Sequence, residues 1–204
     1  MKIKVCGMKY SDNIKAVLEL NIDYMGFIFY PPSSRFFDGD LSGINFKNTR
    51  KVGVFVNEDI EILRQKACQY RLNYVQLHGN EPVSYLQKLK QETFKTIKVF
   101  SVNQNFDFEV CRPYLPVADM FLFDTQGKLP GGNGIQFDWK ILDKYNLNKP
   151  FLLSGGIGRQ HAQQVIDFKH PQCIGVDVNS GFEIKSGLKD VEKLKKFIQQ
   201  LSAF

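Results

Sequence analysis

Two stretches near the C-terminus, FLLSGGIG at residues 151–158 and CIGVDVNSGFE at residues 173–183, decide the fold that this sequence predicts. In each stretch an apolar run ends in a cluster of small residues, SGG at 154–156 and NSG at 179–181. Glycine lets the backbone approach an anion closely, and N–H groups at the start of a following helix add donors. Either turn alone is equally consistent with an ordinary strand-to-helix connection. Together, at this spacing, the two turns predict a phosphate-binding site.

The late position of this pair favours a (β/α)8 barrel, because the loops after the seventh and eighth strands of such barrels commonly bind phosphate. Six further apolar runs precede the pair, so we expect eight strands in all. The six earlier strands are expected at residues 3–6, 23–29, 51–56, 74–77, 94–100 and 120–123.

Segments with helical spacing of apolar residues alternate with these strands. They predict helices at residues 11–20, 59–70, 82–91, 106–114, 138–145 and 190–201, another between the two quoted stretches, and at most a short helix within 37–49. Alternation implies a parallel sheet, and 204 residues give roughly 25 residues per unit. The predicted fold class is therefore α/β, a single (β/α)8 TIM barrel of eight parallel strands spanning residues 1–204. An open doubly wound sheet shows the same alternation, but no G-x-G-x-x-G follows the first strand.

The composition excludes several classes of protein. No apolar run reaches membrane-spanning length and the N-terminus lacks the apolar stretch of a signal peptide, so we expect a cytoplasmic protein with no membrane partner. The four cysteines show no CxxC spacing, which argues against a metal site or a disulfide framework. A net charge of +6 favours an anionic partner. Because the densest lysines, at 193, 195 and 196, lie on the polar face of a predicted helix, we expect a small phosphorylated metabolite and no nucleic acid.

Candidate catalytic residues stand where strands end, since the carboxyl ends of barrel strands carry the chemistry. Cys6 ends the first strand and Asp124 follows the sixth. A thiol and a carboxyl group facing each other across the barrel mouth form a plausible base and acid pair. Lys4 and Lys9 are close enough in sequence to stabilise a Cys6 thiolate. Alternatively, Cys6 is a packing residue and Asp124 caps a turn.

Three further residues follow strand ends. Arg35 either clamps a substrate carboxylate or is a solvated loop charge, and His78 either lines the pocket or caps a turn. Asp177 is expected to brace the phosphate loop through backbone N–H groups. The glycine-rich loop TQGKLPGGNG, at residues 125–134, is expected to form a mobile lid.

The chain resembles the phosphoribosylanthranilate isomerase family over essentially its whole length. The matching segments, in order, are KVCG (4–7), GFIFYPPSSR (26–35), VGVFVNE (52–58), VQLHGNE (75–81), FDT (123–125), GGNGIQFDW (131–139), LSGGI (153–157) and VDVNSGFE (176–183). The resemblance implies a (β/α)8 barrel that needs no cofactor and occurs as a monomer or homodimer. It also implies a substrate, N-(5-phosphoribosyl)anthranilate, that undergoes an Amadori rearrangement in tryptophan biosynthesis.

Residue roles follow from the same resemblance. Cys6 corresponds to the family's general base, Asp124 to its general acid, and Arg35 to the arginine that contacts the anthranilate carboxylate. The SGG and NSG turns correspond to its phosphate site. His78 is added only because of its position after a strand. The expected substrate-binding residues are then Arg35, His78, Gly155, Gly156, Asn179, Ser180 and Gly181. The departures are mild: Met8-Lys9 replaces a more usual small or polar pair, and Phe182 replaces a smaller apolar residue.

Two rival functions remain at this point. The histidine-pathway aminoaldose isomerases share the fold and the reaction, but they resemble this chain less because they carry aspartate at the position of Cys6. A non-catalytic phosphometabolite-binding barrel would keep the two glycine turns and would have no reason to keep both Cys6 and Asp124.

Overall fold

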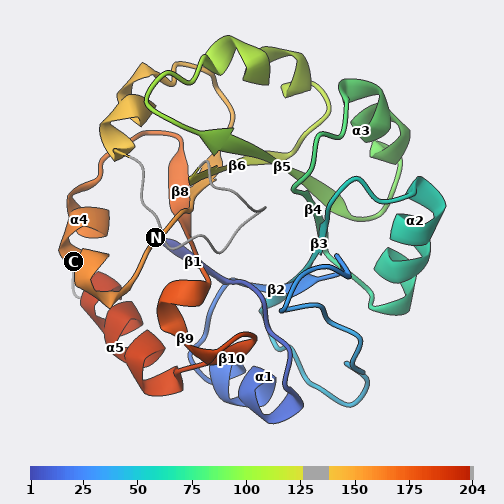
Figure 1. Ribbon diagram of the computed structural model, residues 1–204, viewed down its shortest axis with the longest axis vertical. Coiled ribbons are helices and arrows are strands. Elements are labelled where there is room, and N and C mark those ends of the chain that lie inside the picture. The colour runs from blue at the N-terminus through green and yellow to red at the C-terminus, as the bar shows by residue number, and fades with distance from the viewer. Residues whose placement is uncertain (126–137, 203–204) are drawn as a thin grey trace.

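The computed structural model of the chain describes residues 1–125 and 138–202, with eight parallel strands at its centre (Figure 1). Each strand pairs with the next one in chain order, and β1 also pairs with β8, which closes the sheet into a barrel. The strands are β1 (Lys2–Val5), β2 (Tyr24–Ile28), β3 (Arg50–Phe55), β4 (Tyr74–Leu77), β5 (Lys95–Val102), β6 (Met120–Thr125), β7 (Phe151–Leu153) and β8 (Cys173–Val178). The closed parallel barrel confirms the predicted fold class and excludes the open doubly wound sheet.

Five α-helices among the described residues lie outside the ring of strands (Figure 1). They are α1 (Ser11–Leu18), α2 (Ile60–Gln69), α3 (Val83–Leu89), α4 (Ala162–Asp167) and α5 (Val191–Ser202). α2 begins at Ile60 because the Asp59 carboxylate accepts hydrogen bonds from the backbone N–H groups of Glu61 and Ile62. α5 buries Leu194 and Phe197 and exposes Lys195 and Lys196, as its amphipathic pattern predicts. No helix in the described part of the chain is both long and apolar enough to cross a membrane.

Several predicted helices are shorter or wound more tightly than expected. Residues 108–114 and 139–144 form 3-10 helices, and Pro113, which has no N–H to donate, lies within the first. Residues 37–49 form no helix but a loop with turns at 42–43 and 47–48, in which Phe37 and Phe46 pack their rings against Phe27. The predicted helix between β7 and β8 is a 3-10 turn, Arg159–His161, followed by α4. The sequence also did not predict a hairpin of β9 (Glu183–Lys185) and β10 (Leu188–Lys189).

The barrel interior is apolar towards the amino ends of the strands and polar towards their carboxyl ends. Tyr24 and Tyr74 meet edge to face inside the barrel, with ring centroids 5.4 Å apart, in a cluster with Val52, Ile97 and Leu122. Alternate residues of a strand share a face, so polar residues that follow these positions on the same strands also point inward. A larger apolar cluster packs the outer face of the strands against the helices. The polar side chains at the carboxyl ends of the strands are therefore collected at one mouth of the barrel.

Candidate active site

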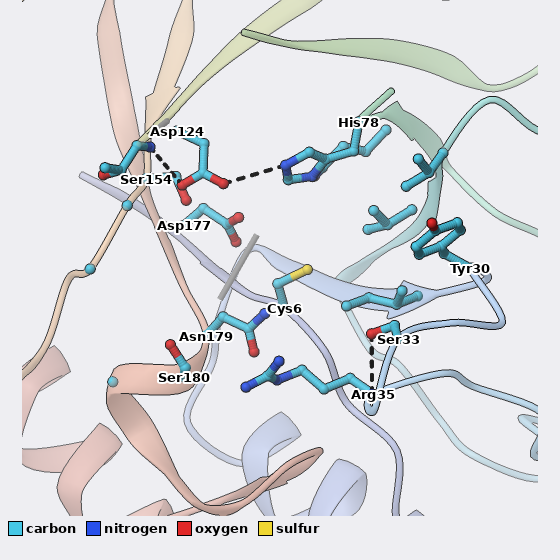
Figure 2. A pocket seen from close by; sticks show the side chains of 18 of the residues that line it. Cys6, Tyr30, Ser33, Arg35, His78, Asp124, Ser154, Asp177, Asn179 and Ser180 are labelled. Atoms are coloured by element: carbon cyan, nitrogen blue, oxygen red, sulfur yellow. Dashed lines mark hydrogen bonds and ion pairs between the residues drawn. The ribbon is translucent and has the colours of Figure 1, made fainter. Parts of the chain in front are cut away.

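A pocket of about 290 Å³ opens at the carboxyl ends of the strands (Figure 2). All nine residues that the sequence nominated line it, although they come from six different strand ends. They are Cys6, Arg35, His78, Asp124, Gly155, Gly156, Asn179, Ser180 and Gly181. The predicted lid, apart from Thr125, lies outside the described residues.

Cys6 follows β1 directly and is held there by its backbone N–H, which donates to the Val178 carbonyl of β8 at 2.9 Å. Its side chain is buried, and burial raises the pKa of the thiol above its ordinary value of 9.0, while the positive charges of Lys4 and Lys189 act in the opposite sense. The sequence expectation was therefore partly wrong. Lys4 does face the thiol, but burial outweighs it, and Lys9 lines a separate surface groove.

Lys4 and Asp177 form a buried ion pair beneath Cys6. Lys4 precedes Cys6 by two residues on the inward face of β1, and its Nζ donates to Asp177 Oδ1 at 2.9 Å. Burial by itself lowers the pKa of Lys4, but the charges of Asp177 and Cys6 more than offset this, so the pKa is raised and Lys4 carries its proton. Asp177 therefore has a different partner from the backbone N–H groups expected from the sequence.

Asp124 lies across the pocket from Cys6, at the end of β6, and is buried apart from 6% of its surface. Its Oδ1 accepts a hydrogen bond from the Thr125 backbone N–H at 2.9 Å, and its Oδ2 lies 3.3 Å from His78 Nε2 (Figure 2). On the far side of the imidazole, Gln76 Nε2 lies 3.1 Å from His78 Nδ1. His78 is thus a pocket residue that connects the amide of Gln76 with the carboxyl group of Asp124.

The two glycine-containing turns lie side by side in the pocket. A Cβ atom on Gly181 would come within 2.3 Å of the Ile157 carbonyl oxygen, so the second turn touches the chain just after the first. Gly155 has a φ of +93°, and a Cβ atom there would come within 2.7 Å of the Thr125 backbone nitrogen. Phe182 packs its ring against Phe197 of α5, which accommodates the larger side chain below the turn. Main-chain groups of both turns therefore face one end of the pocket.

Arg35 is not a solvated loop charge. Its guanidinium forms a bidentate pair with Glu183, in which Nε lies 2.9 Å from Oε1 and Nη2 lies 2.7 Å from Oε2. In the view of Figure 2 the guanidinium extends towards Asn179 and Ser180. Arg35 is thereby directed into the pocket from the loop that follows β2.

Three functional candidates were missed by the sequence analysis. Gln76 carries a detectable signal, since it is a polar residue in an apolar strand, two positions before His78 and on the same face. Glu183 and Lys189 lie in the hairpin that the sequence did not predict. In the described part of the chain, no three His, Cys, Asp or Glu side chains converge as metal ligands.

Comparison with known proteins gives a consistent result across the whole chain. Residues 3–200 match the family model of N-(5′-phosphoribosyl)anthranilate (PRA) isomerase. The N-(5′-phosphoribosyl)anthranilate isomerase of Parabacteroides distasonis is 46% identical over 206 residues, which cover 98% of this chain and 93% of that protein.

Two solved structures extend the comparison to three dimensions. The phosphoribosyl anthranilate isomerase of Thermotoga maritima is 29% identical, with a TM-score of 0.85 and complete coverage of both chains. A phosphoribosyl anthranilate isomerase in complex with reduced 1-(o-carboxyphenylamino)-1-deoxyribulose 5-phosphate is 30% identical, with a TM-score of 0.82 and complete coverage of both chains.

Proposed function

The chain belongs to the N-(5′-phosphoribosyl)anthranilate isomerase family, and from this premise we propose that it rearranges N-(5-phosphoribosyl)anthranilate to 1-(2-carboxyphenylamino)-1-deoxyribulose 5-phosphate in tryptophan biosynthesis. The reaction is an intramolecular aldose-to-ketose isomerisation. One observation carries the proposal: a buried thiol, a buried carboxyl group and two glycine turns line the same pocket. A non-catalytic barrel that binds phosphometabolites would need only the turns.

Ring opening is the first step of the proposed reaction. Asp124, in its acid form, donates a proton to the furanose ring oxygen, and the bond between C1′ and that oxygen breaks. The lone pair of the anthranilate nitrogen forms the C1′=N double bond of an iminium ion, so the electrons balance. The position of Asp124 supports this role, because the Thr125 N–H holds one of its oxygens and the other lies 3.3 Å from His78 Nε2 in the pocket.

Proton removal from C2′ is the second step. The Cys6 thiolate takes this proton, and the C–H electrons form the C1′=C2′ double bond of an enolamine while the iminium nitrogen is neutralised. The enolamine then tautomerises to the ketone: the C2′ hydroxyl loses its proton and becomes the C2′=O carbonyl, while the C1′=C2′ electrons take up a proton at C1′. Lys4 and Lys189 support the thiolate electrostatically, since both lower the pKa of the Cys6 thiol against the effect of burial.

The two anionic groups of the substrate have separate candidate partners in the pocket. We assign the phosphate to the turns that contain Gly155, Gly156, Asn179, Ser180 and Gly181, where the backbone is closely approachable. We assign the anthranilate carboxylate to Arg35, whose guanidinium suits a planar, bidentate anion. No cofactor is required by these steps.

The decisive assay mixes purified protein with freshly made N-(5-phosphoribosyl)anthranilate and follows the loss of substrate fluorescence. Enzyme-dependent loss, with formation of the ketose product, is the expected result. Binding of the substrate without turnover would instead indicate the phosphometabolite-binding barrel. Turnover of the histidine-pathway aminoaldose alone would indicate the other isomerase class.

A further inference from the structure

Glu183 and Lys189 lie behind the pocket surface and are not among its lining residues. We infer that they are positioning residues that hold Arg35 and Asn179 so that the pocket selects an aminoaldose whose aromatic amine carries a carboxylate. The inference rests on the proposed function and deepens it, because it names residues that determine substrate selectivity without touching the substrate.

Glu183 fixes which edge of the Arg35 guanidinium faces the pocket. Its carboxylate engages the edge formed by Nε and Nη2, with distances of 2.9 Å and 2.7 Å for the two shortest bonds. A guanidinium has five N–H donors in a rigid plane, so the edge formed by Nη1 and Nη2 is left to receive a second carboxylate. Glu183 therefore orients Arg35 for the bidentate capture of a planar anion.

Lys189 connects this pair to the phosphate end of the pocket. Its side chain is completely buried, and its Nζ donates to Asn179 Oδ1 and to Glu183 Oε1, each at 2.7 Å. An ammonium group can only donate, so the oxygen of the Asn179 amide must face Lys189 and the NH₂ group must face away from it. Lys189 therefore sets the orientation of the Asn179 side chain.

The charges of this cluster favour an anionic ligand. Burial by itself raises the pKa of Glu183, but hydrogen bonds from Arg35 and Lys189 outweigh it, so the pKa is lowered and the carboxylate stays ionised. Burial lowers the pKa of Lys189, against the opposing charge of Glu183. With Arg35 and Lys189 both protonated, two cations around one carboxylate leave one net positive charge beside the pocket. The cluster thus supplies both the direction and the charge that a substrate carboxylate requires.

Backbone packing makes the arrangement rigid. Gly7, immediately after Cys6, has a φ of +72°, and a Cβ atom there would lie 2.7 Å from Asn179 Oδ1 and 2.8 Å from Arg35 Cδ. The backbone of Lys189 is tied to α1 by two hydrogen bonds with the Asn13 side chain, at 2.7 Å and 2.9 Å. Arg35 and Asn179 are therefore packed between the Cys6 loop and the hairpin.

The test compares two substrates, N-(5-phosphoribosyl)anthranilate and N-(5-phosphoribosyl)aniline, which lacks the carboxylate. Glu183→Gln and Lys189→Met should each raise KM for the anthranilate substrate about 10- to 100-fold, because a buried charge pair loses one partner. In Glu183→Gln the KM for the aniline compound and the kcat values should change much less. Lys189→Met should in addition lower kcat on both substrates, because Lys189 lowers the pKa of the Cys6 thiol. Glu192→Gln and Lys195→Met remove like charges from exposed positions of α5 and should leave both substrates unaffected.

The quantity to compare is the change in KM for one substrate relative to the other, because a merely structural defect would affect both substrates together. An equal rise in KM for the two substrates, or an unchanged KM for the anthranilate substrate, would overturn the inference. If Glu183→Gln does not fold, Glu183→Asp, which keeps the charge but shortens the side chain, must show the same selective loss. Wild-type protein is measured alongside: its failure to turn over the anthranilate substrate contradicts the proposed function, whereas wild-type turnover with unaltered selectivity in the variants contradicts only this inference.

Discussion

The two walls of the pocket hold their polar side chains in different ways. In the anchored wall, formed by Arg35 and Asn179 with Glu183 and Lys189 behind them, charge-assisted hydrogen bonds fix the side chains. In the open wall, formed by Gln76, His78, Asp124 and Thr125, three buried atoms have no hydrogen-bond partner among the described residues: Gln76 Oε1, His78 Nε2 and Thr125 Oγ1. His78 Nε2 lies 3.3 Å from Asp124, a contact whose alignment falls short of a hydrogen bond.

In the proposed mechanism, this difference separates the residues that bind the substrate from those that take part in the reaction. A buried polar atom without a partner costs about 1–3 kcal/mol, a cost that proteins tolerate mainly at functional sites. The anchored wall is oriented by its own ion pairs and hydrogen bonds, whereas three polar atoms of the open wall are left for a ligand to pair. Cys6 lies between the walls in the view of Figure 2.

The largest effects are expected from the groups that move protons. Cys6→Ser and Asp124→Asn should each lower kcat about 10²–10⁴-fold while the KM stays within a small factor, because the anchored wall is untouched. Steady-state kinetics with N-(5-phosphoribosyl)anthranilate provide the check. Cys68→Ser removes an exposed thiol from α2 and is the matched control, expected to retain wild-type turnover. Near wild-type kcat in Cys6→Ser would remove the thiolate from the mechanism.

The next largest effect is expected from the loss of the buried ion pair between Lys4 and Asp177. Lys4→Met leaves Asp177 buried without its counter-ion, so the free energy of unfolding should fall by about 3–5 kcal/mol in urea titrations. Replacing both partners, as in Lys4→Met with Asp177→Leu, should restore much of this stability. A single variant as stable as wild type would show that the pair does not contribute in this way.

A smaller effect is expected where the anchored wall meets the Cys6 loop. Gly7→Ala places a Cβ atom against Asn179 and Arg35 at a positive φ, and should destabilise the protein by about 1–3 kcal/mol. Because the clash displaces the anchored wall, KM should rise more than kcat falls. Thermal unfolding together with kinetics tests this, and a fall in kcat alone would place the damage at Cys6 instead.

The smallest expected effect is a shift in the titration of Cys6. In a Cys68→Ser background, alkylation of Cys6 should accelerate about tenfold per pH unit and level off only above the ordinary thiol value of 9.0, because burial raises the pKa. Lys189→Met should move the plateau to higher pH, since Lys189 of the anchored wall lowers this pKa. A plateau below pH 9, or no shift in Lys189→Met, would contradict the charge arrangement.

The same pKa shift has a consequence for stability. The folded thiol holds its proton more tightly than the unfolded one, so its contribution to stability is fully present below the unfolded pKa and is lost as the pH rises through the folded pKa. The free energies of unfolding of wild type and Cys6→Ser, measured by urea titration on either side of pH 9, should therefore converge towards high pH.

The sequence predicted the framework and the lining residues because both depend on local pattern. β4 spans Tyr74–Leu77, the predicted range, and residues at the ends of parallel strands must meet at one mouth. The ion pairs were not predictable in the same way. Arg35 and Glu183 are 148 residues apart, and Lys4 and Asp177 are 173 apart, so only closure of the barrel brings them together. The 3-10 helices were missed because apolar spacing does not distinguish them from short α-helices.

The most direct test of the assigned roles is the kinetic isotope effect on kcat with substrate deuterated at C2′. In Cys6→Ser, removal of the C2′ proton should limit the rate, and a large primary isotope effect is predicted. In Asp124→Asn, ring opening should limit the rate, and the isotope effect should fall towards unity. A large effect in Asp124→Asn combined with none in Cys6→Ser would contradict the assignment of Cys6 as base and Asp124 as acid.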